Sequence, residues 1–160
     1  MWKVRIATIA LVAAGAAAAA AGAAGCSREA PDAIPHVRLG MAPRDVRERF
    51  QPGGAEPGAW QTALGAGDDT VLEWTARDPA SNITEARFEF HLGMLVAIRA
   101  KTKDTPKHEE VSTTAKTVTV RTPSREGATI TVLARDCPTH HDEAEGYFQR
   151  RGSAPAPRSP

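Results

Sequence analysis

The sequence lacks the short motifs that mark common catalytic sites. It contains no Gly-x-Ser-x-Gly, no glycine-rich phosphate loop and no His-Glu-x-x-His. Few of its polar residues are placed so that they must converge on one point. We therefore expect no enzyme activity, no catalytic residues and no bound cofactor.

The chain also lacks an excess of charge of either sign. It holds 20 basic and 19 acidic residues, which gives a formal net charge of +1 at pH 7. Domains that bind nucleic acid usually present a basic patch or stripe, and none is evident here. Nucleic acid is therefore excluded as an expected partner.

An uncharged N-terminal run is the clearest feature that is present. Residues 1–5 contain Lys3 and Arg5 and no acidic residue, and residues 6–24 are uncharged and consist mostly of Ala, Ile, Leu, Val and Gly. A basic start, an apolar stretch and small residues at its end are typical of a secretory signal. The sequence predicts a signal peptide over residues 1–25.

The small residues at the end of this run are followed directly by a cysteine. Ala23, Ala24, Gly25 and Cys26 resemble the lipobox of bacterial lipoproteins, although that motif usually has Leu where Ala23 stands. The resemblance implies that the signal is cleaved before Cys26 and that Cys26 carries the lipid. The membrane is then a partner through this covalent anchor, since two or more acyl chains suffice for stable attachment.

The residue after the cysteine bears on the destination of the protein. Ser27 stands where lipoproteins kept in the inner membrane commonly have Asp, so we expect the periplasmic face of the outer membrane. Three other interpretations stay open for the N-terminal run. They are soluble export after cleavage at an Ala-x-Ala site, an uncleaved anchor, because about 20 apolar residues can span a bilayer, and a buried helix.

The remainder of the chain divides into a tether, a domain and a tail. We predict a polar tether over residues 26–35, a single α+β domain over 36–149 and a disordered tail over 150–160, which is rich in Pro, Ser and Gly. With Cys26 acylated, Cys137 has no partner for an internal disulfide. We expect it to be a buried thiol or to pair with another chain.

Hydrophobic periodicity predicts the elements of that domain. Pro43 suits a first helical position, and Val46 and Phe50 lie four residues apart, which predicts a short helix within residues 41–50. Alternating apolar and polar residues predict strands over 70–76, 83–91, 95–100, 117–122 and 128–134. The expected fold class is α+β: a short N-terminal helix packed on a four- or five-stranded antiparallel sheet with one covered face, and a short C-terminal helix.

The same alternation predicts which strand residues form the core. Glu89 and His91 are expected in solvent, because they alternate with apolar neighbours on their strand. The residues expected on inward faces are Leu72, Trp74, Ala86, Phe88, Phe90, Val96, Ile98 and Ala100.

Part of this order resembles a lipoprotein family. The runs Val37–Val46 and Ala86–Val96, with the strand that contains Trp74 between them, are similar to the SmpA/OmlA (BamE-like) lipoproteins. In that family a Gly-Met-Thr helix start precedes strands that end in Phe-x-x-Gly-x-Leu-Val. The similarity covers residues 36–100 and the lipobox, with Ala42 in place of the usual Thr or Ser. It implies a scaffold in outer-membrane protein assembly.

Thiol, imidazole and carboxylate groups gather near the C-terminus. Cys137, His140 and His141 are candidate ligands for zinc or copper, but structural zinc sites usually take four ligands from two separated pairs, and no second pair is evident. The segment also has the pattern of a helix start, with Thr139 as the cap and Asp142 in the first turn. We expect the helix and no metal.

Two classes of function follow from these features. The favoured one is a lipid-anchored interaction or scaffold domain of the cell envelope, with proteins of outer-membrane assembly as the partners that the resemblance implies. The alternative is a periplasmic lipoprotein that binds a metal or small ligand through the segment from Cys137 to Glu143.

Overall fold

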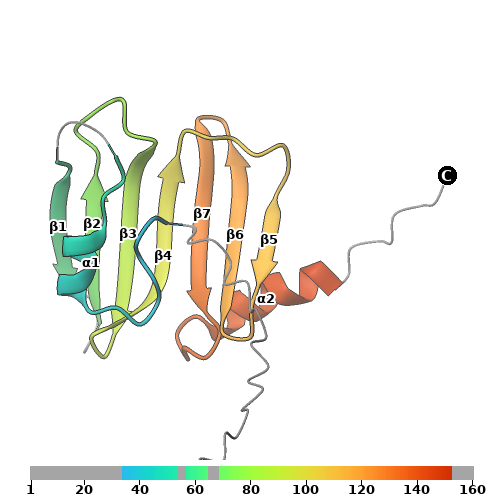
Figure 1. The fold of residues 1–160 in the computed structure, drawn as a ribbon. Helices are drawn as coiled ribbons and strands as arrows, with labels where there is room; N and C mark the ends of the chain where they lie inside the picture. The colour runs from blue at the N-terminus through green and yellow to red at the C-terminus, as the bar shows by residue number, and fades with distance from the viewer. Residues whose placement is uncertain (1–33, 54–56, 65–68, 153–160) are drawn as a thin grey trace, which may run out of the picture.

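Seven strands and two helices make up the part of the chain that the structure describes. The structure is a computed structural model, and it describes residues 34–53, 57–64 and 69–152 (Figure 1). In chain order the elements are α1 (Pro43–Arg49), β1 (Ala59–Leu64), β2 (Thr70–Thr75), β3 (Ile83–His91), β4 (Met94–Thr102), β5 (Glu110–Thr113), β6 (Thr117–Ser124), β7 (Gly127–Ala134) and α2 (His141–Gly152).

All of these strands belong to one antiparallel sheet with the order β1-β2-β3-β4-β7-β6-β5. The first four strands pair in chain order. β7 then pairs with β4, so that β6 and β5 lie beyond it. The two edges of the sheet are therefore β1 and β5.

The predicted α+β class with a four- or five-stranded sheet is wrong. The fold is mostly β, with 45% of the described residues in strands and 16% in helices. The prediction missed the two edge strands, β1 and β5. β1 lies between Gly-rich stretches, and β5 has four residues with Val111 as its only large apolar side chain. An edge strand has a neighbour on one side only and buries less, so its apolar pattern is weak.

The two helices cover opposite faces of the sheet. The adjacent β4 residues Ala97 and Ile98 point to opposite faces, as neighbours in a strand do, and each joins a different buried cluster. Figure 1 shows α1 against the β1–β2 end of the sheet and α2 against the β5–β6 end. The expectation of one covered face is thus also wrong. The α2 core comprises Ala97, Val118, Val120, Leu133 and Ala144, with Val111 and Tyr147 packed against it.

The larger cluster, which we call the α1 core, confirms most of the predicted inward residues. Phe88 is fully buried, and the Phe50 ring of the α1 end meets it edge-on with 5.1 Å between ring centroids. The same ring contacts Trp60 and Trp74. The strand residues of the α1 core are Leu72, Trp74, Ile83, Ala86, Phe88, Phe90, Leu95, Ile98, Ala100, Ile130 and Val132.

One predicted core residue lies on the other face. The register between β3 and β4 shifts beside Glu89 and Phe90, and Phe90 is paired with Leu95. Leu95 is 1% exposed and enters the α1 core, whereas Val96 is half-buried and lines a hollow on the opposite face. A bulge of this kind inserts one residue into a strand and reverses the faces beyond it, which period-two alternation cannot anticipate.

The N-terminal segment before α1 is held against β4. The Gly40 N–H donates to the Leu95 carbonyl at 2.8 Å, and the Leu95 N–H donates to the Met41 carbonyl at 2.9 Å. These bonds join the two runs that carry the family resemblance. Ile34, within the predicted tether, is 1% exposed and belongs to the α1 core.

Helix α1 begins as its sequence predicts. Ala42 occupies the N-cap without a side-chain hydrogen bond, and Pro43 follows at the start of the helix. Val46 is fully buried, which confirms the predicted inward face. Over the residues that the structure describes, neither helix has the length and apolar character needed to cross a bilayer.

Candidate functional site: the charged face of the sheet

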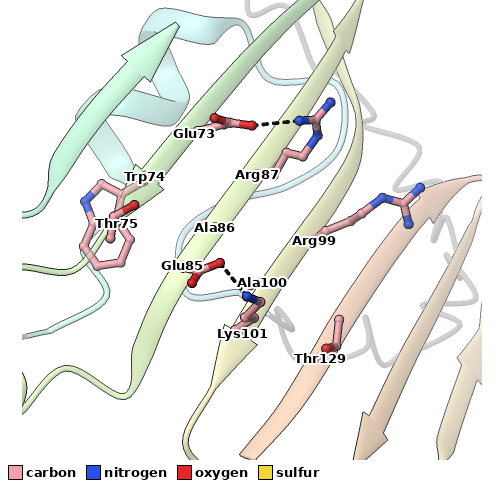
Figure 2. Close-up of a pocket in the computed structure, with 10 residues that line it drawn as sticks. All are labelled: Glu73, Trp74, Thr75, Glu85, Ala86, Arg87, Arg99, Ala100, Lys101 and Thr129. Carbon is pink, nitrogen blue, oxygen red and sulfur yellow. Dashed lines mark hydrogen bonds and ion pairs between the residues drawn. The ribbon is translucent and has the colours of Figure 1, made fainter. Parts of the chain in front are cut away.

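The half of the sheet formed by β1 to β4 carries charged side chains on the face that α1 does not cover. We call six of them the charged ladder. They alternate with α1-core residues along their strands and therefore share one face. Figure 2 draws all of them except Glu89. The ladder consists of Glu73 on β2, Glu85, Arg87 and Glu89 on β3, and Arg99 and Lys101 on β4.

Each cation of the ladder lies next to an anion. Arg87 donates from Nη1 to Glu73 Oε1 at 2.7 Å and from Nε to Glu89 Oε1 at 3.1 Å. Lys101 Nζ lies 2.8 Å from Glu85 Oε2, and this hydrogen-bonded pair raises the pKa of Lys101. Cross-strand pairs of opposite charge stabilise a sheet modestly, by roughly 0.2–1 kcal/mol each.

Arg99 connects the ladder to helix α2. Its guanidinium donates to both carboxylate oxygens of Glu143, at 3.0 and 2.8 Å, and lies 3.4 Å from Glu89. The hydrogen bonds from Arg99 are the main cause that lowers the pKa of Glu143, and those to Glu143 raise the pKa of Arg99. A two-pronged pair of this type fixes orientation as well as distance.

His140 lies next to the Arg99–Glu143 pair. Its side chain is 9% exposed, with Nε2 3.3 Å from Glu89 Oε2 and Nδ1 3.9 Å from Glu143 Oε2. Its carbonyl accepts from the Ala144 N–H at 2.9 Å, the first bond of α2. Because α2 begins at His141, His140 occupies the cap position and the prediction that Thr139 caps the helix is wrong.

Two hollows flank the ladder. The larger, of 390 Å³, is lined on the ladder face by Glu73, Glu85, Arg87, Arg99 and Lys101, with Thr75 and Thr129 beside them (Figure 2). The smaller, of 190 Å³, lies by His140 and is also lined by His91, whose Nδ1 is 2.7 Å from Asp69 Oδ1. Two histidine–carboxylate pairs thus border the smaller hollow.

The structure separates the three predicted metal-ligand candidates. Cys137 is buried and has no disulfide partner among the described residues. His140 faces Glu89, while His141 is exposed with Nδ1 3.0 Å from the Arg135 carbonyl oxygen. Within residues 34–53, 57–64 and 69–152, no group of three or more His, Cys, Asp or Glu side chains is arranged to hold a metal ion.

The predicted lipid-attachment and cleavage residues stay predictions. Cys26, Ala23, Ala24 and Gly25 lie outside the described residues, as does most of the predicted tail. The candidate site therefore consists of the charged face of the sheet.

The charged ladder was not anticipated as a unit. Glu89 and His91 were expected in solvent, yet the Glu89 side chain is 20% exposed and contacts Arg87, Arg99 and His140. A signal was present, because Glu85, Arg87 and Glu89 alternate in sign at every second position of one strand. Such a pattern places opposite charges side by side, where they can pair with the next strand.

The charged ladder presents paired charges of both signs. Its cations are bonded to carboxylates, and the exposed pairs can exchange those partners for complementary charges on another molecule. Comparison with protein-family models, with curated proteins and with solved structures found no match for this chain, so neither a family nor an activity is assigned by similarity.

Proposed function

We propose that this chain is a lipid-anchored interaction domain of the bacterial cell envelope, and that the charged ladder is the surface on which a protein partner docks. The observation that carries the proposal is the uncovered face of β2 to β4. It presents two solvent-exposed ion pairs, Glu73–Arg87 and Glu85–Lys101, with side-chain exposures from 42% to 62%.

The charge pattern favours a protein over a polyanion. Both signs of charge are mixed over the ladder: Glu73 lies opposite Arg87 and Glu85 opposite Lys101, while Arg87 lies opposite Arg99. A partner surface with charges in the complementary order is oriented by this pattern, whereas the wrong register brings like charges together. Recognition by charge pattern therefore supports selectivity for one partner.

The proposed location in the cell envelope and the proposed class of partner rest on the sequence. The resemblance of Ala23 to Cys26 to a lipobox supports a lipid anchor. The similarity of residues 36–100 to SmpA/OmlA lipoproteins supports a role in outer-membrane protein assembly. The hydrogen bonds of Leu95 with Gly40 and Met41 support treating the two similar runs as one unit.

The anchor is tested by Cys26→Ala. In cells fed labelled fatty acid, this variant is expected to take up no label and to keep the length of the precursor. Label that still enters the variant would overturn the anchor while leaving the charged face untouched.

The docking face is tested by reversing one ion pair. The double variant Glu85→Lys/Lys101→Glu keeps a pair whose atoms are 2.8 Å apart but inverts its polarity. Barrel-assembly proteins are expected to co-purify with the tagged full chain from solubilised membranes, and the reversal is expected to abolish this without changing the melting temperature.

A matched control lies on α1. Arg44 and Glu48 form an exposed pair at 2.7 Å, and Arg44→Glu/Glu48→Arg is expected to leave co-purification unchanged. Absence of barrel-assembly proteins from the wild-type sample, or equal loss with both reversals, argues against the proposal.

A second candidate function is binding of a small ligand. The observation in its favour is the 390 Å³ hollow, whose lining side chains carry both signs of charge and suit a small molecule that also carries both. The metal-binding form of this alternative would need metal retained by the purified chain and lost from a His140→Ala/His141→Ala variant.

A further inference from the structure

Strand β1 is an edge of the sheet whose own residues carry no charge, although Arg47 of α1 donates to Thr62 Oγ1 at 2.6 Å and lies over the Trp60 ring. Its six residues, Ala-Trp-Gln-Thr-Ala-Leu, include no charged residue and no proline. Proteins usually protect edge strands with charges, prolines, bulges or short length. The opposite edge, β5, has four residues and begins with Glu110.

The backbone of β1 is regular and open on its outer side. It pairs with β2 at six consecutive positions, and no other strand of the described chain lies beside it. In an antiparallel strand every second residue directs its N–H and C=O away from the neighbour. Gln61, Thr62 and Ala63 are exposed. This outer side can therefore accept one more extended strand.

A surface of mixed character adjoins this edge. Trp60 is half-buried, and a hollow of 490 Å³ beside it is lined by apolar residues such as Phe50 and Pro57 and also by Arg47 and Glu48. A strand added at β1 would cover part of this surface. Apolar burial would then add to the backbone hydrogen bonds.

We propose that the occupant of this edge is β1 of a second copy of the chain, paired antiparallel about a two-fold axis through Gln61. Gln61 then lies opposite Gln61 of the second copy. Trp60 lies opposite the Thr62 of that copy, and Ala59 opposite its Ala63. The result is a continuous sheet through both copies, and it does not depend on the partner proposed above.

Self-complementarity is the reason to choose a second copy over another protein. Residues directly opposite in an antiparallel pair face the same side, so this register keeps α1 on one face in both copies. Within β1 it sets a large side chain against a small one and Ala against Ala, and no residue of the strand is itself charged. The Gln61 amide both donates and accepts, so two of them can bond to each other.

Co-purification of two differently tagged full chains, co-expressed and solubilised in detergent, tests this pairing. Wild-type copies are expected to co-purify. Gln61 pairs with Glu73 of its own chain, so Gln61→Lys is the variant that sets no like charges opposite within one copy. Gln61→Lys in both copies sets like charges directly opposite between the copies and is expected to lower the yield about fivefold, the change that a cost of about 1 kcal/mol gives. Gln61→Lys in one copy with Gln61→Glu in the other is expected to restore it.

The control is Ser112→Lys in both copies. Ser112 is exposed on the β5 edge, so co-purification is expected to stay at the wild-type level. Thermal melts of each variant establish that it is folded. The proposal is overturned if wild-type copies do not co-purify, if the mixed Lys and Glu copies remain as weak as the like-charged ones, or if Ser112→Lys has the effect of Gln61→Lys.

Discussion

Arg99 on β4 and Glu143 on α2 hold each other with two hydrogen bonds, of 3.0 and 2.8 Å, across 44 residues of sequence. The pair joins the α2 helix to the half of the sheet that α1 covers from the other side. Ala144 and Tyr147 connect the same helix to the α2 core. The position of α2 thus depends on a polar contact on one side and an apolar contact on the other.

Loss of the Glu143 charge is expected to weaken this attachment. Glu143→Gln should lower the free energy of unfolding by about 1 kcal/mol, because the bonds are charge-assisted but both side chains remain partly exposed to screening solvent. Urea denaturation measures the change. Glu48→Gln breaks the highly exposed pair with Arg44 and should cost less than about 0.5 kcal/mol. Equal losses of stability in the two variants would show that the Arg99–Glu143 pair stabilises the protein no more than the exposed Arg44–Glu48 pair does.

The same pair predicts a dependence of stability on pH. The hydrogen bonds from Arg99 lower the pKa of Glu143 in the folded protein, whereas an unfolded Glu titrates near about 4.3. A carboxyl with a lowered folded pKa stabilises the protein above its unfolded pKa and loses that contribution as the pH falls through its folded pKa.

The test compares the wild type with Glu143→Gln across acidic pH. The difference in their free energies of unfolding is expected to shrink as the pH falls below about 4. Chemical denaturation at four pH values measures it. A difference that widens toward low pH would contradict the assignment.

Three neighbouring positions of β3 are expected to differ in a graded way. Phe88 is fully buried among aromatic rings, so Phe88→Ala should cost about 3–5 kcal/mol. Glu89→Ala removes three polar contacts and should cost about 1 kcal/mol. Glu85→Ala, at a side chain 53% exposed, should stay within about 0.5 kcal/mol. Thermal melts that rank Glu85 with Glu89 would place Glu89 in solvent, as its alternation alone predicted.

Two glycines are expected to respond with opposite sign to the same substitution. Gly127 has φ +140°, and an added Cβ would collide with the Thr102 carbonyl, so Gly127→Ala should cost about 3 kcal/mol. Gly146 lies within α2, where an added Cβ meets no atom within 4 Å, so Gly146→Ala should add up to about 1 kcal/mol. Melting temperatures that move in the same direction would contradict this contrast.

Strong local patterns in the sequence were sufficient for the central strands and for the first helix. Alternation predicted β3 with its observed bounds, and it predicted the inward position of Phe88. The four-residue spacing of Val46 and Phe50 predicted the buried side of α1. These elements are predictable because the face on which a side chain lies depends on its spacing within the strand or helix and not on residues distant in the chain.

The sequence predicted only part of the candidate site. The outward direction of Glu85 and Arg87 follows from alternation, but their partners on β2 and β4 follow from pairing between strands. His140 was assigned to a metal or to a helix start, whereas the structure places it against Glu89 on a strand about 50 residues earlier. No local signal predicts that contact, because it depends on where α2 lies on the sheet.

The sequence by itself determined the period of each strong element, the side chains that alternate inward and the composition of the uncovered face. The tertiary structure decided the edge strands, the place of β7 beside β4, the bulge at Leu95 and the opposite faces that α1 and α2 cover. The physical reason is that an apolar pattern shows which side chains must be buried but not which part of the chain buries them. Which surface buries it is settled only when segments distant in the chain compete for the same face of the sheet.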